Sequence, residues 1–144
     1  MKTRLRHFAG PLLLASLLAA CGGAVSDEHV IEQPASVEEV DDGEVARITL
    51  TESASERLDI QTVAVEPKGK GLIVPSDALY LTADGLWWVY TNPEPLVFVR
   101  EEIDIEREQG GLAFLSAGPA AGTEVVTVGV PELYGTETGN GSDD

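Results

Sequence analysis

The chain has 144 residues, and its 25 acidic residues against 9 basic ones give a formal net charge of −16. This length allows one domain of about 100 ordered residues, and the charge argues against nucleic acid or an anionic lipid surface as a partner, since both bind clustered lysines and arginines. One cysteine and two histidines exclude a disulfide scaffold and a zinc site built from these residues.

The first 20 residues have the pattern of a signal peptide. Lys2, Arg4 and Arg6 form a positive start, and an apolar run from Leu12 to Ala20 follows. The run is too short for a membrane-spanning helix, which needs about 20 apolar residues, but it fits the apolar region of a secretory signal. We therefore expect residues 1–20 to direct export and to be removed.

The sequence Leu18-Ala19-Ala20-Cys21-Gly22 resembles the lipobox of bacterial lipoproteins. This resemblance implies cleavage between Ala20 and Cys21 and a diacylglyceryl group on the Cys21 sulfur. The alternative is an ordinary secretory signal with an incidental cysteine. Because two or three palmitate-like chains anchor stably where one does not, we expect an exported protein held on the cell membrane by lipid. Its folded part would be periplasmic or at the cell surface.

Residues 21–44 are expected to form an acidic disordered linker that begins at the lipidated cysteine. Residues 22–44 contain eight acidic residues and no lysine or arginine, so the segment repels itself and extends. The cluster 41–44 could be read as a calcium loop, but it lacks the spacing of an EF-hand. His29 has no partner histidine and is assigned no role. The Gly-rich polar tail, residues 135–144, is also expected to be disordered.

Residues 45–134 are expected to form the folded domain. Residues 45–50 alternate apolar and polar side chains, as a half-buried strand does. Thr51 can then cap a short helix that carries Ala54 and Leu58 on one face. Residues 60–65 alternate again, a loop is expected at 67–71, and Pro75 suggests that the strand at 72–74 lies at a sheet edge.

Further strands are expected on both sides of several turns. The Asp84-Gly85 pair predicts a hairpin between 79–81 and 87–90, because these residues tolerate positive φ. The remaining expected strands are separated by glycine-containing turns and lie at residues 96–106, 112–115 and 125–128. The fold class is therefore mainly β, a small β-barrel or sandwich of about seven strands with one short helix.

Three stretches of this domain resemble the periplasmic adaptor subunits, or membrane fusion proteins, of RND-type efflux pumps. The first is ARITLTESASERLDIQTVAVE, residues 46–66. The second is VPSDAL, residues 74–79, followed by Asp84-Gly85 and by WVY at 88–90. The third is LSAGPAAGTEVV, residues 115–126, in which Pro119 stands where the family usually has leucine.

The resemblance implies the membrane-proximal domain of such an adaptor. In the family, a lipoyl-like domain and a long helical hairpin lie between the first and second stretches, whereas in this chain only the loop around 67–71 stands in that place. The resemblance thus implies a non-catalytic, lipid-anchored accessory or truncated adaptor that contacts an inner-membrane RND-type transporter. It would not bridge to an outer channel. The alternative is a stand-alone surface lipoprotein that binds cations or another protein.

No catalytic constellation, metal site or cofactor is predicted, because histidine and cysteine are too few for a nucleophilic relay. Metal transfer through methionines is not expected either, since Met1 is the only methionine. Trp87 and Trp88 are adjacent, so a strand would turn one inward and the other outward. With Tyr90 they are the candidate contacts for a partner. The sequence does not predict the oligomeric state.

Overall fold

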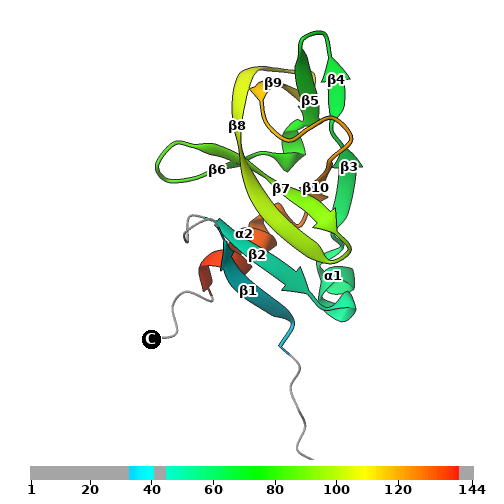
Figure 1. Ribbon diagram of the computed structural model, residues 1–144, viewed down its shortest axis with the longest axis vertical. Coiled ribbons are helices and arrows are strands. Elements are labelled where there is room, and N and C mark those ends of the chain that lie inside the picture. The colour runs from blue at the N-terminus through cyan, green and yellow to red at the C-terminus, as the bar shows by residue number, and fades with distance from the viewer. Residues whose placement is uncertain (1–32, 41–44, 140–144) are drawn as a thin grey trace, which may run out of the picture. The chain divides into compact units, whose positions relative to one another are not determined.

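The structure is a computed structural model that describes residues 33–40 and 45–139. The predictions for the signal peptide, Cys21, His29 and the 41–44 cluster lie outside these residues. The described chain is mainly β, with antiparallel strands forming a nearly closed, barrel-like sheet. This confirms the predicted fold class (Figure 1).

Strands β1 (Ala35–Val40) and β2 (Val45–Leu50) pair with each other, and β2 also pairs with β8 (Val97–Gln109). Helix α1 (Glu52–Leu58) begins after Thr51, whose hydroxyl accepts a hydrogen bond of 3.1 Å from the Ala54 amide. Such a cap stabilises a helix by about 1 kcal/mol. The strand at 45–50 and the capped helix are therefore as predicted.

The barrel follows the strand order β3-β10-β7-β8-β9-β5-β4. Its remaining strands are β3 (Gln61–Ala64), β4 (Glu66–Lys68), β5 (Gly71–Pro75), β7 (Trp87–Glu94), β9 (Leu112–Ala117) and β10 (Glu124–Val128). Because only Val65 separates β3 from β4, the path starts and ends on one stretch of chain. The Val65 amide donates to the Thr123 carbonyl at 2.8 Å, and the Val65 carbonyl accepts from Gly122 at 2.8 Å. These bonds extend the β3–β10 pairing up to the point where the chain enters β4.

The predicted hairpin around Asp84-Gly85 is present as β6 (Tyr80–Leu81) paired with β7. The prediction of an edge strand before Pro75 is wrong, because β5 lies between β4 and β9. The proline is accommodated because β4 pairs only with Gly71–Ile73. Pro75 therefore has β9 alone as its neighbour.

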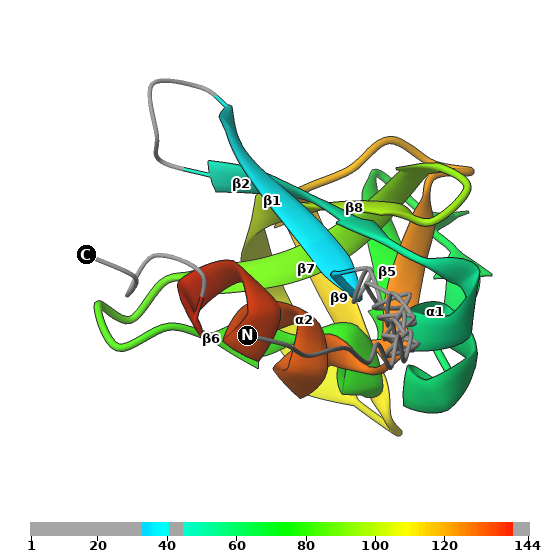
Figure 2. The same cartoon turned by 90° about the horizontal axis from the view of Figure 1, so that it is seen from below.

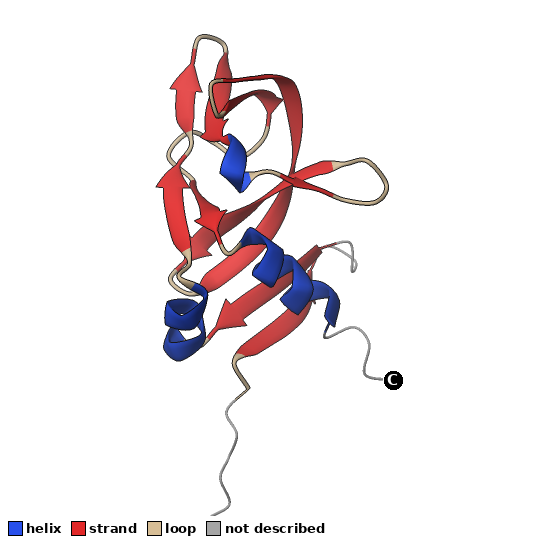
Figure 3. Ribbon diagram, turned by 180° about the vertical axis from the view of Figure 1, so that it is seen from behind, coloured by secondary structure: helices blue, strands red, loops and turns tan. Residues whose placement is uncertain are grey.

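Two predicted disordered regions contain regular structure. Strand β1 lies inside the range 21–44, where its half-buried Ala35 and Val37 pair with Leu50 and Ile48 of β2. Helix α2 (Val130–Gly139) continues through half of the tail predicted to be disordered and packs against β1 and β2 (Figure 3). In both segments the polar composition conceals an element that tertiary contacts stabilise.

The domain has two hydrophobic cores, one on each face of the sheet. The first fills the barrel and includes Val89, Ile103 and Val125. The second lies on the outer face, where α1, α2 and β2 cover it, and includes Tyr90 and Val126. In β7 the adjacent residues Val89 and Tyr90 therefore pack into different cores. The same is true of Val125 and Val126 in β10. Leu133 of α2 is 0 % exposed in the second core, which anchors this helix.

Candidate functional site

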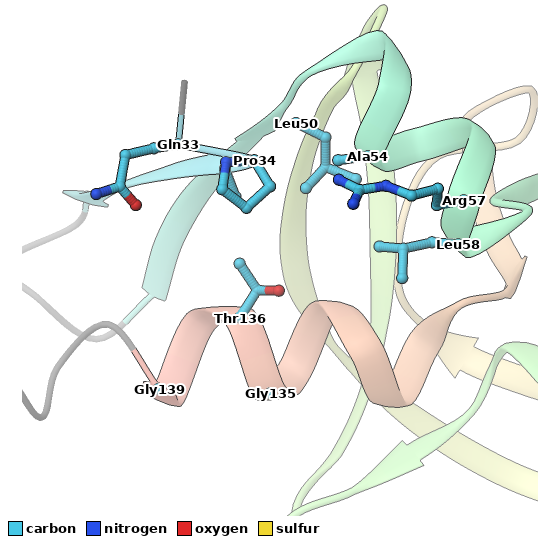
Figure 4. Close-up of a pocket in the computed structure, with 10 residues that line it drawn as sticks. Gln33, Pro34, Leu50, Ala54, Arg57, Leu58, Gly135, Thr136 and Gly139 are labelled. Carbon is cyan, nitrogen blue, oxygen red and sulfur yellow. The ribbon is translucent and has the colours of Figure 1, made fainter. Parts of the chain in front are cut away.

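An apolar groove of about 480 Å³ lies between the start of β1, helix α1 and helix α2. Seen from below, β1 lies between the two helices (Figure 2). Figure 4 shows Thr136 pointing from α2 toward Pro34, with Leu50, Ala54 and Leu58 on the facing side. A cavity of this volume is in the range that holds small ligands or a few side chains of a partner.

Two glycines keep the α2 wall of this groove open. Gly135 and Gly139 are one helical turn apart, and both line the groove. A Cβ atom at either position would meet nothing within 4 Å. The groove therefore depends on α2, the helix that the sequence did not predict. The signals for this helix were Pro131 in its first turn and apolar residues at 130, 133 and 134.

Replacing Gly135 with alanine is expected to stabilise the domain. The backbone there is helical and the space is open, so alanine adds helix propensity of about 0.5–1 kcal/mol without a clash. Urea unfolding should show a higher midpoint for Gly135→Ala. The same change at Gly139, the last residue of the helix, should have a smaller effect. A lower midpoint for Gly135→Ala would show that α2 is not helical at this position.

The two tryptophans lie on opposite faces of β7, as predicted, and both are half-buried. Trp87 packs against the barrel core. Trp88 lies on the other face, where its Nε1 donates to the Thr82 hydroxyl at 3.2 Å and the Arg100 guanidinium lies 4.5 Å from its ring centroid. Trp88 also lines a polar hollow of about 490 Å³ beneath the β6–β7 turn. It therefore remains a candidate contact for a partner.

Tyr90 does not meet the requirement for a partner contact, because it is 0 % exposed. Its hydroxyl donates a hydrogen bond of 2.5 Å to Glu137 Oε2, and Arg100 Nε lies 2.9 Å from Glu137 Oε1. The Glu137 side chain is only 7 % exposed. Tyr90, Arg100 and Glu137 thus form a buried cluster that joins α2 to the barrel. The prediction of Tyr90 as a surface contact is corrected by this arrangement.

Burial, followed by the hydrogen bond to Glu137, raises the pKa of the Tyr90 hydroxyl far above its usual range. Burial and the neighbouring Tyr134 also raise the pKa of Tyr80 to about 12. The two rings of Tyr80 and Tyr134 pack with their centroids 4.3 Å apart. Because its own pKa is raised, the Tyr90 hydroxyl keeps its proton and donates its hydrogen bond to Glu137 at any physiological pH.

This raised pKa predicts a loss of stability in alkali. Above pH 10 the unfolded chain releases the Tyr90 proton while the folded chain keeps it, so the free energy of unfolding falls by up to about 1.4 kcal/mol per pH unit. Tyr90→Phe lacks this group, and its stability should fall less steeply between pH 10 and 12. Urea unfolding of both proteins across this range measures the difference. Parallel curves would contradict the assignment.

Other ionised groups lie on the surface. The Thr82 hydroxyl, which bonds to the Asp84 carboxylate, lowers the pKa of that exposed side chain. Glu102 and Asp104 are both exposed on β8. Within residues 33–40 and 45–139, no three His, Cys, Asp or Glu residues are grouped as metal ligands. No helix in this part of the chain is long and apolar enough to cross a membrane.

The sequence matches no protein-family model and no curated protein.

Proposed function

We propose that the protein is an exported, lipid-anchored, non-catalytic accessory of an RND-type transmembrane efflux transporter. It would correspond to the membrane-proximal part of a periplasmic adaptor. The lipid would be carried by Cys21, and the folded residues would act outside the cytoplasm.

One observation carries this proposal. The third stretch that resembles the adaptor family is distant in sequence from the first two, yet strands of all three are neighbours in one sheet. Strand β3 of the first stretch pairs with β10, which begins within the third stretch. Strand β10 also pairs with β7 of the second, through Val125 and Thr91. Three segments with the family's order that assemble into one domain support a common origin.

The connection between the first two stretches supports the truncated form of the adaptor. Strands β4 and β5 pair directly, with Lys68 opposite Gly71. The connecting turn is short, and Gly69 adopts a φ of 65° in it. A domain that closes through a short turn needs no long insertion for its sheet. The proposed role is therefore to rest on the transporter, not to reach a distant channel.

We place the transporter contact at the apolar groove. Gln33 and Pro34 line the groove, so the chain that leads to Cys21 joins the domain at this wall. A lipid on Cys21 would keep this wall within reach of a membrane protein, whose apolar side chains would fill the groove. A photo-crosslinking amino acid in place of Thr136 should capture the transporter, whereas the same group at exposed Gln109 should not. Equal capture at both positions would argue against the groove.

Replacing Cys21 with alanine is expected to move the protein from the membrane fraction to the soluble extracytoplasmic fraction. The lipid chains supply the anchoring free energy, and without a sulfur atom at this position they cannot be attached. Fractionation and mass measurement of the mature chain test this directly. Unchanged membrane retention of Cys21→Ala, or a wild-type mass without acyl chains, would contradict the anchor.

In-cell crosslinking of the tagged protein, followed by mass spectrometry, tests the transporter itself. Recovery of a large multi-span transporter, lost in a Gly135→Leu variant that fills the groove, supports the accessory function. Recovery of only surface proteins at saturating crosslinker would favour the stand-alone binding lipoprotein instead. Calcium titration by calorimetry separates the cation-binding form of that alternative, because saturable heat is expected only if the acidic surface holds an ion.

A further inference from the structure

Positive charge is unevenly distributed over the described chain. Its six basic residues are Arg47, Arg57, Lys68, Lys70, Arg100 and Arg107. Three of them, Lys68, Lys70 and Arg107, line a single hollow of about 390 Å³ at one end of the barrel. Half of the cations thus share one site in a protein whose net charge is −16. We name these three side chains and their hollow the basic end.

The other three cations already have partners. Arg47 pairs with Glu94 at 3.3 Å, and Arg100 pairs with Glu137 at 2.9 Å. The Arg57 Nε donates to the backbone carbonyl of its own helix at 3.2 Å. The first two contacts join separate elements of the domain, and the third lies within helix α1.

The cations of the basic end have no comparable role. Among the described residues, neither Lys68 nor Lys70 forms an ion pair within 4.0 Å. The one carboxylate among the described residues that pairs with Arg107 is that of its chain neighbour Glu106, at 4.0 Å, and both side chains are more than half exposed. Exposed pairs of this kind contribute little, so Arg107 remains able to bind another carboxylate.

The surroundings of these charges are ordered and partly apolar. The Arg107 guanidinium lies 3.7 Å from the centroid of the Phe114 ring, a stacking that holds its donors in a fixed plane. Lys68 ends β4 and Lys70 lies in the turn to β5. Strand β5 approaches β9 so closely that a Cβ on Gly71 would collide with the Leu115 carbonyl. Leu72 and Phe114 supply apolar surface to the same hollow.

We propose that the basic end binds an acidic segment of a protein partner. Lysines offer mobile point charges, and the stacked arginine offers a planar fork that matches a carboxylate. Glu106 is the one carboxylate that lines the hollow, and a second carboxylate would displace it from Arg107. The β4–β5 turn is at the opposite end of the domain from α1 and α2 (Figure 1), the helices whose residues line the apolar groove. The two surfaces can therefore be occupied together.

Neither the transporter nor the lipid is needed for this binding, because it arises from the charges at the basic end. Because the rest of the protein is acidic, attraction is confined to the immediate surroundings of these three side chains. Binding should weaken as salt rises, since the charges involved are exposed.

The test uses a short labelled peptide in which pairs of acidic residues alternate with leucine, and a counterpart with glutamine and asparagine in place of the acids. Fluorescence anisotropy with the full mature chain should show salt-dependent binding of the acidic peptide alone. Lys68→Glu should weaken this binding roughly tenfold, a loss of about 1.4 kcal/mol. Arg57→Glu is the matched control, because it makes the same charge change at an exposed site beside the groove.

Three results would overturn the proposal. The first is equal binding of the acidic and amide peptides. The second is an equal loss of binding in Arg57→Glu and Lys68→Glu, because this would show a non-specific charge effect. The third is binding of polyphosphate or of phosphatidylglycerol vesicles in preference to the acidic peptide, because the basic end would then recognise phosphate. Arg107→Ala provides a second variant, since it removes the stacked fork without adding a negative charge.

Discussion

Glu137→Ala is expected to lower the free energy of unfolding by about 3 kcal/mol. The substitution leaves the Arg100 guanidinium and the Tyr90 hydroxyl without their shared acceptor. The Arg100 side chain is only 19 % exposed and Tyr90 is 0 % exposed, so water replaces the lost carboxylate poorly. Removing one member of a buried ion pair costs more than the pair itself contributes, because a buried charge remains.

Urea unfolding of Glu137→Ala and of Thr138→Ala provides the measurement and its control. Thr138 is the next residue of α2, it is exposed, and its hydroxyl donates to the Tyr134 carbonyl of the same helix at 2.8 Å. Its substitution should change stability by less than about 0.5 kcal/mol. A chain ending at Tyr134, the predicted domain boundary, should lose as much stability as Glu137→Ala or more. If that shortened chain were as stable as the full one, α2 would not be anchored through Glu137.

Gly129→Ala is expected to destabilise the domain by about 2–4 kcal/mol, for two separate reasons. Gly129 joins β10 to α2 with a φ of 96°, a conformation that strains any residue with a Cβ. The added Cβ would also collide with Ile60 Cδ1, the end of a side chain that packs against the second hydrophobic core, on the outer face of the sheet. Relief of the collision requires Ile60 to move away from that core.

A second glycine separates these two contributions. Gly85 has a similar φ of 88°, but a Cβ there would meet nothing within 4 Å. Gly85→Ala therefore measures backbone strain alone, about 1–2 kcal/mol, and the additional loss in Gly129→Ala measures the collision. Combining Gly129→Ala with Ile60→Val should recover part of that additional loss, since Ile60 loses its Cδ1 atom. Equal effects at Gly85 and Gly129 would show that Ile60 moves freely.

The elements that the sequence predicted well are those with local causes. The strand at 45–50 alternates along its whole length, and Thr51 caps the following helix through an amide only three residues away. The hairpin at Asp84-Gly85 likewise follows from two adjacent residues. Such signals are contained in a short window of sequence, so no tertiary information is needed to read them.

The elements that the sequence concealed depend on distant partners. The second half of α2 consists of weak helix formers such as Gly135 and Thr136, and it is held by Glu137, whose partner Arg100 is in another element. Strand β1 has two adjacent glutamates and gains its order from pairing with β2. The groove combines β1, α1 and α2, so two of its three walls were expected to be disordered. The residues that line the groove come from distant segments of the chain, so no local sequence pattern predicts that they meet.

The pairing of β3 with β10 also has a consequence for the time course of folding. Val63 and Val125 are register partners although about 60 residues lie between them. Strand β2 likewise pairs with β8, which lies about 50 residues further along the chain. Such distant pairings carry a large entropic cost of chain closure before any contact offsets it, and β-domains of this kind fold in milliseconds to seconds. An emerging chain that lacks residues 124–128 cannot close its barrel. Exposed apolar strands are therefore unavoidable until β10 is available.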